Sequence, residues 1–226
     1  MTHTHTKKIV KKKKKSVESE LSNGHFRVTI FGSARIKESD ATYKQIYELA
    51  KMIGEKGFDL ITGGGPGIMN AASAGHFKGD RRNRADSIGL KIRLPREQKD
   101  SRHLEVEKIF TRFSSRLDNF MALSNAVVVT EGGIGTTLEL FYTWQLMQVG
   151  HIRPIPIILV GPMWRELVRW VRRYLLRSKL IDKKDLDHVF CVKTNVEAMK
   201  IIMKSYIMFK KDNKKYGANF GQYKLT

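Results

Sequence analysis

The sequence is poor in cysteine, in long apolar runs and, at its two ends, in acidic residues. Its one cysteine, Cys191, excludes an internal disulfide and a zinc site with several cysteines, and we predict it as a small core residue in a strand over residues 189–192. No apolar run approaches the roughly 18 to 20 residues that a membrane span needs. The lysine-rich N-terminus lacks the apolar segment of a secretory signal. These absences predict a soluble, cytoplasmic protein.

Acidic residues are almost missing from the two ends, although the chain as a whole has a formal net charge of +20. Residues 1–15 contain seven Lys and no acid, and residues 204–226 contain six Lys and one Asp. We predict a basic, disordered arm over residues 1–24 and a basic tail over residues 209–226, which aid solubility or contact polyanions nonspecifically. A nucleic-acid-associated protein is one hypothesis, but the interleaved aromatics and the modules of a sequence reader are missing.

Strand and helix patterns alternate between these ends, over residues 25–208. This alternation predicts a single α/β domain with a doubly wound, mostly parallel sheet and helices on both faces. Strands are expected at residues 26–31, 58–62, 87–92, 106–110, 127–129, 156–160 and 189–192. Helices are expected between residues 40 and 57 and at residues 68–76, 113–123, 136–150, 164–176 and 195–208. Tryptophans 144, 164 and 170 fall on predicted helices, which favours core or subunit contacts over base stacking.

Two glycine-rich turns follow predicted strands, Gly63-Gly64-Gly65-Pro66-Gly67 and Gly132-Gly133-Ile134-Gly135. Ligands of parallel sheets bind beyond the carboxyl ends of the strands, where both turns fall. The first N–H groups of a helix have no internal partner and the helix dipole is positive there, so the second turn predicts a phosphate seat. Neither turn has the spacing of a dinucleotide fingerprint. No Walker lysine follows either turn, which argues against an ATP-hydrolysing P-loop.

Glu139 lies one turn into the helix that we expect Thr136 to open. The pattern Thr136-Thr137-Leu138-Glu139 is that of a capping box, in which the carboxylate bonds back to the helix start. The alternative is that Glu139 belongs to the site formed by the glycine turn. The pattern alone favours both interpretations about equally.

An ordered set of motifs resembles the Lonely Guy (LOG) family from about residue 27 to residue 202. The motifs are Gly32-Ser33-Ala34-Arg35, Gly63-Gly64-Gly65-Pro66-Gly67-Ile68-Met69, Leu94-Pro95-Arg96-Glu97-Gln98, Arg116, and Gly132-Gly133-Ile134-Gly135-Thr136 with Glu139. The resemblance implies a Rossmann-like fold and a phosphoribohydrolase that acts on AMP or a cytokinin riboside monophosphate and releases the base and ribose 5-phosphate. It also implies a homodimer or larger homo-oligomer that needs no metal or organic cofactor. Many members are labelled lysine decarboxylases, but nothing in this sequence indicates a pyridoxal-phosphate site.

The same resemblance assigns roles to individual residues. Arg116 and Glu139 are the implied catalytic residues: Arg116 positions the nucleotide, and Glu139 stabilises an oxocarbenium-like state or activates water. The 5′-phosphate is expected at Gly132, Gly133, Gly135, Thr136 and Thr137. The rest of the nucleotide is expected at Gly32, Ser33, Arg35, Gly63, Gly64, Gly65 and Met69. For Glu97 the sequence leaves two alternatives: it faces the site, or it is a solvated loop residue.

Two residues depart from the family pattern. Glu131 stands where the family usually has Pro, and Leu117 where it usually has Lys. If both positions face the pocket, the site is less positive by about two charges and phosphate binding weakens, unless Arg35 or the basic segment 78–102 compensates. Alternatively, Glu131 points away from the ligand. These departures keep a nonenzymatic nucleotide or molybdenum-cofactor carrier on the same fold as the alternative function.

Overall fold

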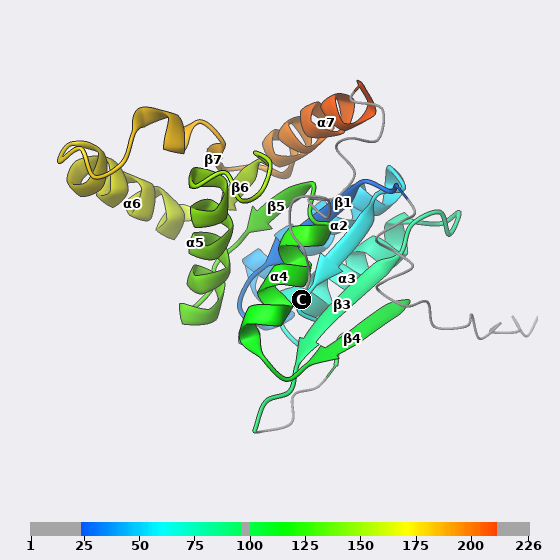
Figure 1. The fold of residues 1–226 in the computed structure, drawn as a ribbon. Helices are drawn as coiled ribbons and strands as arrows, with labels where there is room; N and C mark the ends of the chain where they lie inside the picture. Colours follow the sequence, from blue (N-terminus) through cyan, green and yellow to red (C-terminus); the bar gives the residue numbers. More distant parts are fainter. Residues whose placement is uncertain (1–23, 96–99, 212–226) are drawn as a thin grey trace, which may run out of the picture.

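A seven-stranded, all-parallel sheet forms the centre of the computed structural model, which describes residues 24–95 and 100–211 (Figure 1). The strand order is β4-β3-β2-β1-β5-β6-β7. The chain therefore builds outward from β1 to β4, crosses back over the sheet, and continues outward on the other side of β1. The strands are β1 (Arg27–Phe31), β2 (Asp59–Thr62), β3 (Ser87–Ile92), β4 (Val106–Phe110), β5 (Ala126–Val129), β6 (Ile157–Val160) and β7 (Val189–Val192). This topology confirms the predicted doubly wound, Rossmann-like α/β fold.

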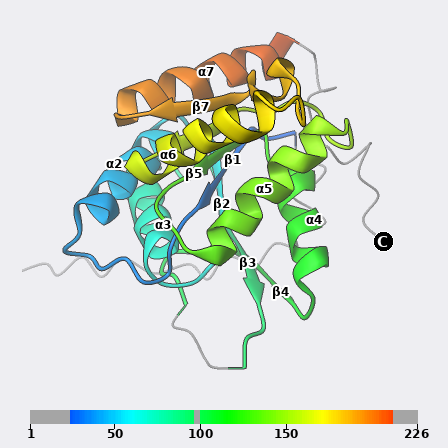
Figure 2. The same ribbon diagram turned by 90° about the vertical axis from the view of Figure 1, so that its left-hand side faces the viewer.

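Helices cover both faces of the sheet (Figures 1 and 2). They are α2 (Ala41–Glu55), α3 (Ile68–Gly79), α4 (Phe113–Leu123), α5 (Ile134–Gln148), α6 (Pro162–Trp170), the π-helical η1 (Val171–Leu176), the 3-10 helix η2 (Lys183–Leu186) and α7 (Asn195–Lys211). One core cluster joins the sheet to α2, α3 and α7, and the other joins it to α4, α5, α6 and η1. Across residues 24–95 and 100–211, no helix is both long enough and apolar enough to cross a membrane.

Successive side chains along a strand point alternately into the two cores. In β5, Val127 and Val129 belong to the core under α4 and α5, whereas Val128 belongs to the core under α2 and α7; all three are fully buried. A strand covered on both faces has no polar side, which is why its sequence is an unbroken apolar run. Full burial of each such side chain contributes about 1.5 to 3 kcal/mol.

Several details differ from the sequence-based expectation. Cys191 is exposed rather than buried, because β7 is an edge strand and only Val192 in it is buried. Trp144 and Trp164 are buried as expected, but Trp170 is not a core residue, since nearly half of it is exposed. The predicted domain boundary at residue 208 falls inside α7, where Phe209 packs against Phe26 with ring centroids 5.4 Å apart. The predicted arm lies outside the described residues except for residue 24, as does the predicted tail beyond residue 211.

Candidate active site

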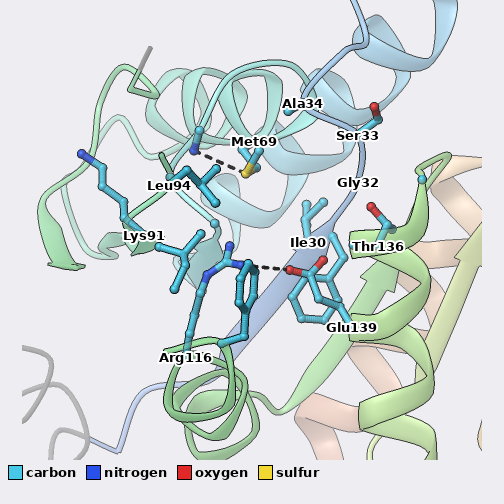
Figure 3. Close-up of a pocket in the computed structure, with 18 of the residues that line it drawn as sticks. Ile30, Gly32, Ser33, Ala34, Met69, Lys91, Leu94, Arg116, Thr136 and Glu139 are labelled. Carbon is cyan, nitrogen blue, oxygen red and sulfur yellow. Dashed lines mark hydrogen bonds and ion pairs between the residues drawn. The ribbon is translucent and has the colours of Figure 1, made fainter. Parts of the chain in front are cut away.

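A cavity of about 760 Å³ opens at the carboxyl ends of β1, β2, β3 and β5 (Figure 3). It lies where the strand order reverses between β1 and β5, the position at which open parallel sheets bind ligands. Each of the four strands contributes the segment in which it ends or the turn that follows it. These segments are residues 30–35, 63–65, 91–94 and 133–136.

Two side chains from different helices meet inside this cavity. Arg116 of α4 places Nη1 3.5 Å from Oε1 of Glu139 on α5. Two further contacts hold the guanidinium of Arg116 in place: its Nε donates to the Leu90 carbonyl at 2.7 Å, and its Cζ lies 5.1 Å from the Phe120 ring centroid. Figure 3 shows the two side chains pointing toward each other across the pocket. The fold thus brings together the two residues predicted to be catalytic.

Gly63 makes room for this pair. A Cβ at position 63 would collide with the guanidinium of Arg116 and would lie 2.7 Å from the Met69 sulfur. The N–H of Gly65 faces that same sulfur at 3.3 Å. The first glycine turn is therefore shaped by the side chains of Arg116 and Met69.

Glu139 is mostly buried, with 13% of its side chain exposed. Burial raises the pKa of its carboxyl group to about 7, and the nearby charge of Arg116 partly opposes this increase. At neutral pH the protonated and ionised forms are therefore both populated. A carboxyl group tuned in this way is suited to general acid–base chemistry.

Helix α5 begins at Ile134, two residues earlier than predicted, and has Gly133 at its N-cap with no side-chain cap. Its first backbone bond runs from the Thr137 N–H to the Gly133 carbonyl, at 2.9 Å. The capping-box interpretation of Glu139 is wrong, because Glu139 lies in the second turn of the helix. Without a side-chain cap, the N–H groups of residues 134–136 are available to an anion beside the cavity.

The predicted phosphate residues divide into two groups. Gly133, Gly135 and Thr136 line the cavity, whereas Gly132 and Thr137 do not. Gly132 supports the turn, since a Cβ there would collide with the Thr136 side chain, and the Thr137 hydroxyl donates to the Gly133 carbonyl at 3.0 Å. All residues predicted for the rest of the nucleotide line the cavity: Gly32, Ser33, Arg35, Gly63, Gly64, Gly65 and Met69. Glu97 lies outside the described residues.

A family model described as "Possible lysine decarboxylase" matches residues 69–202. The chain belongs to this family, the LOG family. The pyrimidine/purine nucleotide 5′-monophosphate nucleosidase of Escherichia coli strain K12 is 25% identical over 141 residues, which cover 60% of this chain and 31% of that protein. The chain thus spans about a third of the length of the curated relatives it matches.

Solved structures similar to this LOG-family chain include a molybdenum cofactor carrier protein and a molybdenum cofactor binding protein. The molybdenum cofactor carrier protein of Chlamydomonas reinhardtii has a TM-score of 0.59 and 21% identity, with coverage of 81% of this chain and 99% of that one. The molybdenum cofactor binding protein of Rippkaea orientalis has a TM-score of 0.58 and 20% identity, with coverage of 80% and 96%. At this level of identity the likeness shows the fold alone.

The two departures from the LOG pattern do not face the cavity. The carboxylate of Glu131 accepts a hydrogen bond from the Thr42 hydroxyl of α2 at 2.9 Å, and Leu117 is a buried residue of α4. Neither lines the cavity. The condition for a loss of about two positive charges, that both positions face the pocket, is therefore not met, and the side chain of Glu131 is directed toward α2. Its carbonyl accepts the Ser33 N–H at 3.0 Å and ties the turn after β5 to the turn after β1.

Sequence reasoning missed several residues of the cavity. Lys91 of β3 lines it, and its Nζ lies 2.8 Å from Asp100 and 3.5 Å from Glu107. A lysine at the carboxyl end of an otherwise apolar strand was the available signal. The apolar side chains Ile109, Phe113 and Ile134 also line the cavity and remain largely exposed. No pattern in the sequence indicates that β4, α4 and α5 meet at this point.

Acidic groups are few around the cavity, where Asp100 and Glu139 are the carboxylates among the lining residues. In the part of the chain that the structure describes, no cluster of three or more His, Cys, Asp or Glu residues has the arrangement of a metal site.

Proposed function

We propose that this LOG-family protein is a nucleoside 5′-monophosphate phosphoribohydrolase, which hydrolyses the N-glycosidic bond of AMP or a cytokinin riboside monophosphate to release the base and ribose 5-phosphate. The observation that carries the proposal is the Arg116–Glu139 pair inside a nucleotide-sized pocket, next to the uncapped start of α5. The similarity to a nucleotide 5′-monophosphate nucleosidase supports the reaction class.

The 5′-phosphate binds at the start of α5 in this proposal. Backbone N–H groups of residues 134–136 donate to its oxygens, and the positive end of the helix dipole favours its charge. Ribose and base then extend toward the turns after β1 and β2, along residues 32–35 and 63–65. The ribose is thereby placed beside the carboxylate of Glu139.

Hydrolysis breaks the C1′–N bond and leaves the bonding electron pair on the base, which takes up one proton, while the hydroxyl of the attacking water becomes bonded to C1′. The sugar becomes oxocarbenium-like, and the carboxylate of Glu139 stabilises that positive charge or takes a proton from the water that attacks C1′. Arg116 holds Glu139 in place and lowers its pKa against the effect of burial, which keeps part of the population ionised at neutral pH. The proposal requires no metal or organic cofactor.

Incubating the purified protein with AMP, other nucleoside 5′-monophosphates and a cytokinin riboside monophosphate, with chromatography of the free base, tests the activity. We expect base and ribose 5-phosphate in equal amounts, and a loss of about 100-fold or more in kcat for Glu139→Gln. Glu131→Gln is the matched control, because that carboxylate bonds to Thr42 outside the cavity, and it should retain activity. Base release that is unchanged in Glu139→Gln would disprove the mechanism.

Tight nucleotide binding without base release would favour the alternative, a nonenzymatic nucleotide or molybdenum-cofactor carrier. The fold is compatible with that function, since molybdenum-cofactor carriers share it. Calorimetric titration with AMP, run beside the activity assay, separates binding from turnover.

A further inference from the structure

The outer face of α6 and η1 combines arginines with exposed aromatic rings. Positions three, four, seven, eight and eleven residues after Glu166 lie on one side of a helix, and all six residues on this side are exposed. We call them the Arg-aromatic face: Glu166, Arg169, Trp170, Arg173, Tyr174 and Arg177. The helix lies at the end of the sheet opposite β4, outside the active-site cavity (Figure 1).

The inner face of the same helix is already occupied. Trp164 and Val171 are fully buried in the core under α5, and partly buried leucines and valine pack against that core. These flanking residues are Leu167, Val168, Leu175 and Leu176. A helix that lies in a membrane surface must bury its apolar side in lipid, and this one buries that side in its own protein.

Trp170 and Tyr174 are the exposed rings of the face. Trp170 is 47% exposed and Tyr174 is 50% exposed, whereas Trp144 and Trp164 are buried. The two exposed rings lie 5.9 Å apart between centroids, and the guanidinium of Arg173 lies 5.6 Å from the Tyr174 centroid. Aromatic surface next to guanidinium groups is therefore assembled before any partner binds.

The charge of this region is strongly one-sided. Residues 162–180 contain five Arg and one Lys, against Glu166 as the one acid. Glu166 pairs with Arg169. Within residues 24–95 and 100–211, no carboxylate pairs with Arg172, Arg173 or Arg177. The partner that fits such a surface is an anion.

We propose that the Arg-aromatic face binds single-stranded nucleic acid, with a base stacked on Trp170 and phosphates paired to Arg173 and Arg177. Stacking on aromatic rings beside arginines is how proteins hold single strands without reading their sequence. Bases inside a duplex are already stacked and cannot reach these rings. A second copy of the same face would bring arginines against arginines, which disfavours a symmetric contact.

Binding of a fluorescein-labelled 20-mer of dT or U, followed by anisotropy with the full-length protein, tests the proposal. We expect Trp170→Ala and Tyr174→Ala each to weaken binding about tenfold. Tyr174→Phe, which keeps the ring, should bind as the wild type does. Replacing Arg173 and Arg177 with Ala should weaken binding more than replacing Arg81 and Arg82, an exposed pair beyond the C-terminus of α3. Circular dichroism and melting curves confirm that each variant is folded.

Tryptophan fluorescence provides an independent test, because the chain has three tryptophans and Trp170 is exposed whereas the other two are buried. Unlabelled dT 20-mer should quench this emission, and inorganic polyphosphate, which has charge but no bases, should not. The proposal is overturned if Trp170→Ala binds the 20-mer as tightly as the wild type does, or if duplex and polyphosphate compete as well as single strands. If anionic phosphatidylserine vesicles shift the tryptophan emission to shorter wavelength and the dT 20-mer does not quench it, the face binds lipid instead.

Discussion

At the scale of single residues, the raised pKa of Glu139 makes stability depend on pH. Its carboxyl group holds its proton more tightly in the folded protein, because burial disfavours the charge. The resulting stabilisation is complete below the unfolded pKa of about 4.3 and is lost as the pH rises through about 7. We expect the free energy of unfolding of the wild type, relative to Glu139→Gln, to fall by up to about 3 kcal/mol between pH 4.5 and pH 8.

Urea denaturation of both proteins across this pH range measures the difference. Glu48→Gln, on the exposed part of α2, controls for the loss of one carboxylate elsewhere. A difference between wild type and Glu139→Gln that stays constant with pH would contradict a raised pKa at this position.

Burial raises the pKa of Glu139, and the charge of Arg116 partly opposes that increase. Because its positive charge lowers the pKa of Glu139, Arg116→Gln should raise that pKa further. If the ionised carboxylate acts in catalysis, the rising limb of kcat/KM against pH should move from near 7 to higher pH. Arg116→Lys retains the charge but loses the bond from Nε to the Leu90 carbonyl, so its limb should move less while kcat falls. If kcat/KM rises at the same pH in wild type and Arg116→Gln, a group other than Glu139 is responsible for that rise.

At the scale of elements, the start of α5 and the turn after β2 contain glycines for different reasons. A Cβ at Gly135 meets no atom within 4 Å, whereas one at Gly63 collides with Arg116. We expect Gly135→Ala to leave the melting temperature unchanged and to raise KM for AMP about tenfold, because its methyl group occupies the proposed phosphate seat. Gly63→Ala should lower both stability and kcat, because Arg116 must move away from Glu139.

Melting curves and steady-state kinetics distinguish the two cases. Inhibition by inorganic phosphate should weaken in Gly135→Ala in parallel with KM, since both ligands use the same N–H groups. An unchanged KM in Gly135→Ala would place the phosphate elsewhere in the pocket.

Local chemistry predicted most elements of this fold and part of its site. The three valines of β5 and the glycines that follow them are a short-range signal, so this strand and turn were expected where they lie. The start of α5 was misplaced, because Gly133 and Ile134 have no capping pattern. The contact between Arg116 and Glu139 joins residues of two helices, and only the family resemblance indicated it. Lys91 was missed because its place in the cavity depends on how β3 lies next to the glycine turn.

At the scale of the whole molecule, the fold determines where charged and apolar side chains gather on the surface. Composition alone does not give these positions. Most of the net charge of +20 lies at the two ends of the chain, yet the arginines of α6 and η1 gather on one face of the folded domain. Trp170 shows the same limit, since the sequence placed it on a helix but not on the solvent side of that helix. Which side of a helix is buried depends on the neighbouring elements.

Apolar side chains next to the cavity support the predicted homodimer. Ile134, Leu138 and Phe141 recur at helical spacing on α5 and are exposed, while its other face buries Leu140 and Trp144. Exposed Phe113 of α4 and Ile109 of β4 line the cavity together with Ile134. Exposed apolar side chains that recur on one helix face are typical of a protein–protein contact.

We therefore expect the protein to form a homodimer through this surface, which would cover one side of the pocket entrance. Leu138→Glu with Phe141→Glu should shift sedimentation from dimer to monomer and raise KM for AMP, because the partner no longer shields the entrance from water. Phe77→Glu, at an exposed apolar position near the C-terminus of α3, is the control and should leave the dimer intact. A wild-type monomer at micromolar concentration, or a double variant that remains dimeric, would show that these side chains have another role.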